Sequence, residues 1–163
     1  MKPIRNIDDL TFESQRAGTR FAAQFAQLGP LIGSRKLGCR VNVVPPGKAA
    51  WPFHSHLVNE ELVFVLGGCG ELRFGAERFP LRAGDVVGLP PGGAEYAHQI
   101  INNGDEDLRY LAVSTMEEPE IGLYPDSGKF AVFAGAPPGG DKRQRSFTYI
   151  GRPDSAVAYW DGE

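Results

Sequence analysis

The sequence predicts an all-β fold, a jelly roll of short antiparallel strands with little helix. Its apolar runs are brief and rich in β-branched and aromatic residues. The 21 glycines and 13 prolines fall between these runs instead of gathering in one low-complexity block. Turn formers such as "FGAE", "RAGD" and "NNGDED" separate the runs. Many short strands joined by reversing turns are typical of two sheets that face each other around a common interior.

The apolar runs predict ten strands in chain order. They are expected at residues 21–28, 37–44, 61–66, 71–74, 78–81, 86–89, 98–102, 108–115, 130–133 and 146–150. The segment "RFAAQFAQLG" also has helical propensity, but it is short and a proline follows it, so its structure stays open.

The length and charge of the chain restrict its function. The 163 residues are enough for one domain with a core of its own, expected over residues 1–163. Within it we expect N-terminal strands over 19–44, the part that carries the histidines over 45–115, and a C-terminal extension over 116–163. A net charge of −3 gives no reason to expect nucleic acid or a membrane surface as a partner. The start "MKPIRNIDDLTFESQ" lacks the apolar stretch of a secretion signal, and no window is long enough to span a membrane, so we expect a cytoplasmic protein.

Two central segments, "ELVFVL" and "LRYLAVST", are apolar on both faces. A half-exposed strand would alternate with polar residues. The outer face is therefore expected to be covered, either by the N-terminal strands or by a second subunit, and we predict a homodimer. Cys39 and Cys69 have neither metal-ligand spacing nor a disulfide framework and are expected to be free thiols.

The stretch "WPFHSHLVNEELVFVLGG" holds two of the three histidines in the chain. Residues two apart on a strand project from the same face, so His54 and His56 can both reach one point in the interior. A carboxylate on the next strand would complete a two-histidine, one-carboxylate site for a first-row metal. Glu60 and Glu61 cannot both point inward. We choose Glu61 as the inward-facing candidate, because it lies on the same face of the expected strand as Val63 and Val65.

The third imidazole, His98, stands at the head of "HQIIN" and is a further candidate ligand. A histidine on its own is more often a surface or core residue than a ligand. Here all three histidines fall into one pattern followed by a glutamate, and this pattern predicts one divalent transition metal, such as zinc, manganese, iron or nickel.

With these residues in view, the chain resembles the cupin superfamily. Its first motif would be "PGKAAWPFHSHLVNEELVFVLGG" and its second "GDVVGLPPGGAEYAHQIIN", separated only by residues 69–83. The residues that match the two motifs are Gly47, His54, His56, Glu61 and Gly68, then Gly84, Pro90, Gly92, His98 and Asn102. The resemblance covers residues 45–115 and implies a double-stranded β-helix with a metal-binding interior.

The chain departs from the family pattern at two places. One extra residue precedes His54, which a loop can absorb. The stretch from Gly92 to His98 is three residues longer than usual, so the position where the histidine normally falls is Glu95. His98 is kept as a ligand because its spacing to Asn102 matches, and Glu95 stays open as an alternative ligand or a nearby acid–base group.

The flanking segments "AHQIIN", "DEDLRYLAVST", "YPDSGK" and "YWDGE" resemble bacterial single-domain cupins described as sugar-phosphate-isomerase-like. That resemblance implies a metal that polarises a carbonyl of a small-molecule substrate while a carboxylate, Glu95 or an inward-facing Glu60, moves a proton. The same ligands would also suit an iron-dependent dioxygenase or a cupin that binds a small ligand without catalysis. The fold alone does not choose among these functions.

Cationic side chains that could bind a phosphate show no recognisable phosphate-binding loop. Those near the motifs are Lys48, Arg73, Arg109 and Lys129, and each is expected to be a solvated charge. The loop "GAPPGGDKRQR" is interpreted as a flexible surface segment whose Lys142, Arg143 and Arg145 are solvated. Near the end, Tyr159 and Trp160 are predicted to pack over the domain or over a partner subunit.

Overall fold

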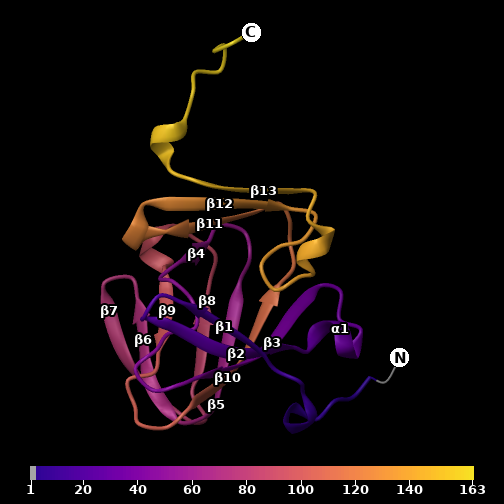
Figure 1. Ribbon diagram of the computed structural model, residues 1–163, viewed down its shortest axis with the longest axis vertical. Helices are drawn as coiled ribbons and strands as arrows, with labels where there is room; N and C mark the ends of the chain where they lie inside the picture. The colour runs from indigo at the N-terminus through magenta and orange to yellow at the C-terminus, as the bar shows by residue number, and fades with distance from the viewer. Residues whose placement is uncertain (1–2) are drawn as a thin grey trace.

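The computed structural model describes residues 3–163, which form antiparallel sheets around one interior (Figure 1). One short α-helix, α1 (Gly29–Ile32), follows the second strand. The strands are β1 (Glu13–Ala17), β2 (Phe21–Gln27), β3 (Leu37–Val44), β4 (Ser55–His56), β5 (Glu61–Gly67), β6 (Cys69–Phe74), β7 (Glu77–Arg82), β8 (Val86–Leu89), β9 (His98–Ile101), β10 (Leu108–Thr115), β11 (Glu120–Tyr124), β12 (Lys129–Ala134) and β13 (Phe147–Gly151).

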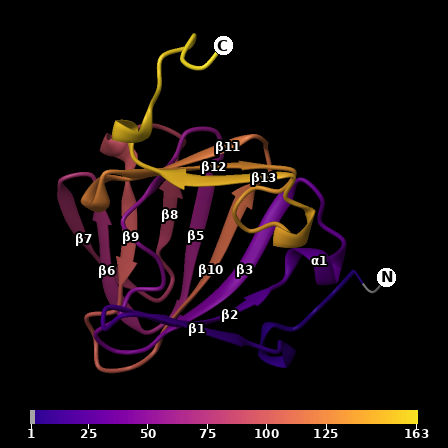
Figure 2. The same cartoon turned by 45° about the horizontal axis from the view of Figure 1, so that its top comes forward.

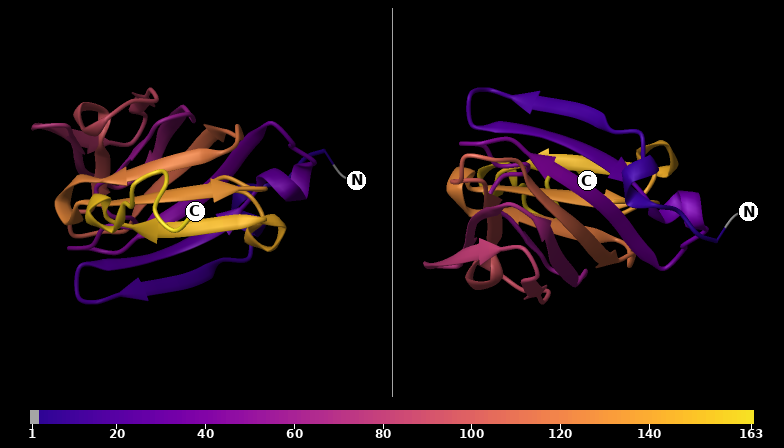
Figure 3. Two further views of the ribbon diagram at one scale, coloured as in Figure 1. Left: turned by 90° about the horizontal axis from the view of Figure 1, so that it is seen from above. Right: turned by 90° about the horizontal axis from the view of Figure 1, so that it is seen from below.

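The largest sheet has the order β1-β2-β3-β10-β5-β8, and the two smaller sheets have the orders β13-β12-β11-β4 and β7-β6-β9. In Figure 2 the strands β11, β12 and β13 cross the top of the molecule above the long strands β3, β5 and β10. Seen from above in Figure 3, they lie between the indigo N-terminal strands on one side and the magenta strands on the other. This arrangement is the predicted jelly roll, with an interior enclosed by strands from distant parts of the chain.

The core is built from alternating positions of the central strands. In β5 the side chains of Val63 and Val65 are 3% and 1% exposed, while those of Leu62 and Phe64 are 44% and 38% exposed. Val63 and Val65 belong to one buried apolar cluster that also includes Leu108 of β10. Glu61 has the parity of the inward valines, so β5 directs this carboxylate toward the interior.

The N-terminal strands do not cover the apolar outer face of β5. Instead β2 pairs with β3, and β1 pairs with β2, so that they lengthen the same sheet sideways. Leu62, Phe64 and Val86, which is 58% exposed, remain on the outside of β5 and β8. The N-terminal strands, which were one of the two covers expected from the sequence, therefore do not cover this apolar face. Its cover by a second subunit, in a homodimer, stays a prediction.

Three strands were missed by the sequence analysis, namely β1, β4 and β11. β1, "ESQRA", has no buried residue and is held by its pairing with β2 at the edge of the sheet. β4 has only two residues and is defined by its pairing with β11. The ambiguous segment after Arg20 is strand β2, with α1 following it, because pairing on both sides outweighs its helical propensity.

The C-terminal segment corrects another expectation. Tyr159 and Trp160 are 85% and 77% exposed, and their rings contact each other edge-on with centroids 4.8 Å apart. In Figure 1 the segment after β13 runs away from the sheets. The prediction that these aromatic residues pack over their own domain is wrong, because the last residues leave the sheet after Gly151; cover by a partner subunit stays a prediction. Among the described residues, no helix is long and apolar enough to cross a membrane.

The turn after β5 depends on a glycine. Gly68 has φ +78°, and a Cβ atom there would collide with the carbonyl oxygen of Asp107. A side chain at this position is therefore strained by the backbone conformation and blocked by the neighbouring strand.

We expect Gly68→Ala to lower the free energy of unfolding by more than ~1 kcal/mol, measured by urea denaturation. Gly88→Ala is the matched control, because Gly88 lies in β8 without a positive φ, and a Cβ added there would meet no atom within 4 Å. Equal stability of the two variants would contradict this account of the turn.

Candidate metal centre

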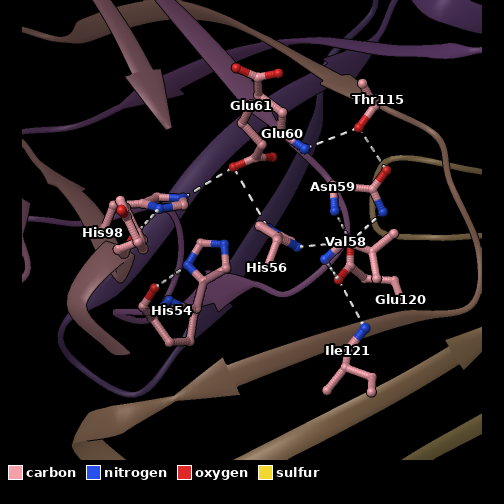
Figure 4. A network of polar contacts seen from close by, with 12 residues as sticks. His54, His56, Val58, Asn59, Glu60, Glu61, His98, Thr115, Glu120 and Ile121 are labelled. Carbon is pink, nitrogen blue, oxygen red and sulfur yellow. Dashed lines mark hydrogen bonds and ion pairs between the residues drawn. The ribbon is translucent and has the colours of Figure 1, made fainter. Parts of the chain in front are cut away.

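Four side chains converge inside the barrel. The candidate ligand atoms of His54, His56, Glu61 and His98 all lie within 4.8 Å of one another. They come from separate elements: His56 ends β4, Glu61 begins β5 and His98 begins β9, while His54 precedes β4. Figure 4 shows the Glu61 carboxylate between the rings of His98 and His56. The structure thus brings together the set of residues that the sequence singled out.

The backbone holds His54 and His98 as a pair. The His54 amide donates to the His98 carbonyl at 3.1 Å, and the His98 amide donates to the His54 carbonyl at 2.7 Å. These two bonds join the segment before β4 to β9 and set the ring centroids 4.7 Å apart. The Glu61 Oε2 atom lies 3.1 Å from His98 Nε2 and 3.7 Å from His56 Nε2.

A second carboxylate, Glu120 of β11, supports His56 from behind. Glu120 is fully buried, and its Oε2 lies 3.5 Å from His56 Nδ1. It accepts hydrogen bonds from the backbone amides of Asn59 at 3.1 Å and Ile121 at 2.9 Å, and another from the Asn59 side chain. A carboxylate behind a histidine orients the ring and makes its other nitrogen a better ligand. The sequence did not predict a role for Glu120, because no motif marks this residue.

Burial and mutual contacts change the protonation of these groups in different directions. Burial and then the fields of His98 and His56 lower the pKa of His54 to about 3, so this imidazole is neutral at pH 7 and its free nitrogen can bind a metal. Burial alone would raise the pKa of Glu61, but the hydrogen bond from His98 and the nearby imidazoles outweigh it and hold the pKa far below its usual range. Burial alone would lower the pKa of His56, and the contact with Glu120 and the field of Glu61 raise it instead.

The donor set fits a transition metal. Atoms bonded to one ion at about 2.0 to 2.2 Å lie at most about 4.4 Å apart, so small side-chain shifts close this cluster around an ion. His56 Nε2 is buried and has no hydrogen-bond partner, and such an orphaned nitrogen costs free energy unless something binds it. Imidazole and carboxylate together suit zinc, iron, nickel and manganese.

Two predicted acid–base groups lie elsewhere. Glu60 is exposed, its amide donates to the Thr115 hydroxyl at 3.0 Å, and its carboxylate points away from the cluster in Figure 4. Glu95 is also exposed and accepts a hydrogen bond from the Gly93 amide at 3.2 Å. The longer loop before His98 forms a short 3-10 turn that directs Glu95 outward and leaves His98 facing the cluster.

A cavity of about 320 Å³ opens beside the cluster, and a recess of about 40 Å³ adjoins it. Both are lined by Arg40, Trp51, His54 and Glu61. The wider cavity is also lined by Tyr124, whose ring stacks on His54 with centroids 6.2 Å apart. A cavity of this size suits a small molecule.

The cations around the cavity are not those near the motifs. Arg73 pairs with Asp126 at 2.7 Å and Arg109 with Asp8 at 3.1 Å, while Lys48 donates to the Thr19 carbonyl at 2.7 Å. The lining instead includes Arg40, Lys142 and Arg145.

The expectation that the whole 142–145 cluster is solvated is therefore wrong. Arg145 donates from Nε to the Ala136 carbonyl at 3.0 Å and covers the Phe133 ring. Arg143 fits the expectation better, because its exposed side chain pairs with Asp141 at 2.8 Å. The thiols are free as expected, with Cys69 exposed and Cys39 in the cavity lining.

Comparisons with known proteins identify the fold family. The family model of the cupin domain matches residues 40–114, which contain all four candidate ligands. Residues 40–114 of the chain form a cupin domain. One curated relative of this cupin, the oxalate-binding protein of Thermotoga maritima, is 34% identical over 70 residues, or 43% of this chain and 54% of that protein. The chain spans about half the length of the curated relatives it matches.

Two solved structures resemble this cupin over most of its length. A candidate sugar phosphate isomerase from Acidithiobacillus ferrooxidans is 25% identical, with a TM-score of 0.74 and coverage of 93% of this chain and 91% of the other. A cupin-superfamily sugar phosphate isomerase from Silicibacter pomeroyi has a TM-score of 0.76 and 22% identity, with 98% of each chain covered. The second likeness shows the fold alone. The resemblance of this cupin thus extends well beyond the two motifs.

The role of Glu120 can be tested on metal affinity. We expect Glu120→Gln to weaken zinc binding about 10- to 100-fold, because the amide no longer orients His56 as a charged acceptor does. The measurement is a competition titration with a chromophoric chelator. Glu117→Gln is the matched control, since Glu117 is a nearby exposed glutamate; an equal loss in both variants would contradict the role assigned to Glu120.

Proposed function

We propose that this cupin binds one divalent transition metal through His54, His56, Glu61 and His98 and acts on a small molecule in the adjoining cavity. The observation that carries the proposal is the convergence of these four ligand atoms within 4.8 Å at the wall of a cavity of about 320 Å³. The bound metal would act as a Lewis acid on a carbonyl or hydroxyl oxygen of the substrate. The adjoining cavity would hold the substrate oxygens beside such an ion.

The reaction that we propose is a sugar-phosphate-isomerase-like conversion, in which a proton moves between neighbouring carbons. Its support is the likeness to the Acidithiobacillus ferrooxidans structure over nine-tenths of the chain, together with the metal cluster. A carboxylate base was expected from the sequence, but Glu61 is the single carboxylate among the described residues that line the cavity. Any proton transfer there must therefore involve Glu61 or another type of side chain.

Tyr124 is the second ionisable group that we assign to this reaction. A tyrosine phenol is protonated at pH 7, and burial raises the pKa of Tyr124 further. A protonated phenol beside the cluster would donate a hydrogen bond to an oxygen on which negative charge develops. Glu61, whose pKa is far below its usual range, stays ionised and contributes negative charge to the cluster.

The metal site is tested with adjacent glutamates. We expect the purified protein to contain one divalent metal per chain by elemental analysis, and Glu61→Gln to lose most of it, because a neutral amide is a much weaker ligand than a carboxylate. Glu60→Gln is the matched control, as Glu60 is the exposed neighbour, and it should retain the metal. Full metal content in Glu61→Gln and in the double variant His54→Ala/His56→Ala would sink the proposed site.

The reaction is tested separately with the metal-loaded protein. We expect turnover of an aldose phosphate to the corresponding ketose phosphate, measured by NMR over a panel of sugar phosphates, and a lower kcat in Tyr124→Phe. Iron as the resident metal together with substrate-dependent oxygen uptake would instead favour a dioxygenase. Ligand-induced thermal stabilisation without turnover would favour a binding protein.

A further inference from the structure

Three polar atoms beside the cluster are buried without a hydrogen-bond partner. They are Arg40 Nε, Trp51 Nε1 and Gln27 Oε1. Two of them are N–H donors, and donors of this kind are nearly always satisfied in the interior of a protein. Leaving the Arg40 and Trp51 donors unpaired costs free energy, so their arrangement is best explained by a bound group that accepts their hydrogen bonds.

The sheet places Arg40 close to the candidate ligands. Arg40 of β3 pairs in register with Gln27 of β2 on one side and with Ala112 of β10 on the other. The next inward residue of β10, Ser114, pairs with Glu61 of β5. Arg40 therefore stands on the same inner face as the Glu61 ligand, and β10 alone separates their two strands.

Arg40 is held by an aromatic ring instead of a counter-ion. Its guanidinium carbon lies 4.3 Å from the centre of the Trp51 ring and 5.9 Å from that of Phe25. Among the ion pairs within residues 3–163, none involves Arg40, whereas Arg73, Arg78 and Arg109 all contact carboxylates. A cation–π contact compensates only part of the cost of removing a guanidinium from water. Arg40 thus keeps a charge that a ligand can satisfy.

The charged side chains that line the cavity indicate whether the ligand is an anion or a cation. The lining of the cavity contains three cationic side chains, Arg40, Lys142 and Arg145, and one anionic side chain, Glu61. A divalent metal at the cluster would make this balance more positive still. Such a surface attracts anions and repels small cations.

We propose that Arg40 and Trp51 form an anion subsite that binds a carboxylate or phosphate group of the small-molecule ligand. The guanidinium would pair with the anion, and the indole N–H would donate one hydrogen bond to it. Arg40 and Trp51 line the cavity of about 320 Å³ together with His54 and the cations Lys142 and Arg145, so the anionic group would lie beside the cluster. A cavity of this size holds a small molecule that carries such a group.

The inference deepens the proposed function, since it rests on that function for the claim that one ligand contacts both the metal and Arg40. The anion subsite itself consists of this chain's own side chains and does not require a metal. Its test can therefore be made on metal-free protein, where failure of the metal site has no influence.

The chain offers a local probe for this test. It contains two tryptophans, and Trp160 is 77% exposed at the far C-terminal segment. In a Trp160→Phe background, the remaining tryptophan fluorescence reports on Trp51 alone. We expect inorganic phosphate or acetate, titrated into the metal-free protein, to change this fluorescence with saturation, and the anion with the lower Kd identifies the preferred group.

Arg40→Gln should weaken that binding about 10- to 100-fold, because it removes a charge-assisted hydrogen bond. Arg40→Lys should give a smaller loss, because the charge remains while the forked donor geometry is lost. Arg82→Gln is the matched control, since the Arg82 side chain is 87% exposed on β7, outside the cavity lining, and it should bind as the parent does.

Three outcomes would overturn the subsite. These are no saturable change with either anion, equal affinity in Arg40→Gln and the parent, and an equal loss in Arg82→Gln. If Arg40→Gln does not fold, the Arg40→Lys variant is measured instead, and an unchanged Kd in Arg40→Lys counts against the proposal.

The variant His54→Ala/His56→Ala separates the metal site from the anion subsite. Loss of metal with retained phosphate or acetate binding in this variant supports the subsite. In the parent protein, metal binding without anion binding overturns the subsite while leaving the metal site standing.

Discussion

The enclosure of one carboxylate, Glu61, by imidazoles inside a β-barrel is the constraint on which the rest of this structure depends. A charged group in an apolar interior is tolerated only with partners, and here His98 and His56 supply them at 3.1 and 3.7 Å. Each partner needs its own support. The backbone pair of His54 and His98 joins β9 to the segment before β4, and Glu120 of β11 fixes His56. Strands from both smaller sheets are thus tied to the same polar centre.

The sequence predicted which side chains cluster, because their inward orientation depends on their position along the strands. His54 and His56 are two residues apart, and Glu61 begins a strand whose apolar positions alternate, so strand geometry alone aims all three inward. His98 was harder to place, because a longer loop precedes it and only the closed barrel shows that its backbone pairs with His54. The outward orientation of Glu95 was hard to predict for the same reason, since the orientation of a loop side chain depends on the turn in which it lies.

What the sequence could not predict is mostly non-local. Arg40 sits in an ordinary strand pattern, and its importance becomes evident only when β3, β10 and β5 are aligned in register. Glu120 lies in the segment "MEEPEIG", which carries no motif and is more than fifty residues from His56 along the chain. Lys142 and Arg145 belong to a loop whose sequence is typical of a solvated segment, but in the structure both residues line the cavity. No periodicity of sequence encodes such meetings between distant segments.

The two parts of the binding region come from different stretches of the chain. The cluster of candidate ligands lies wholly within residues 40–114, the part that matches the cupin domain, whereas Tyr124, Lys142 and Arg145 lie beyond it. Mutations in the later stretch can therefore reshape the cavity while the cluster of candidate ligands is preserved. The C-terminal strands and loop are thus the part of this chain in which the choice of small molecule can change independently of the cluster.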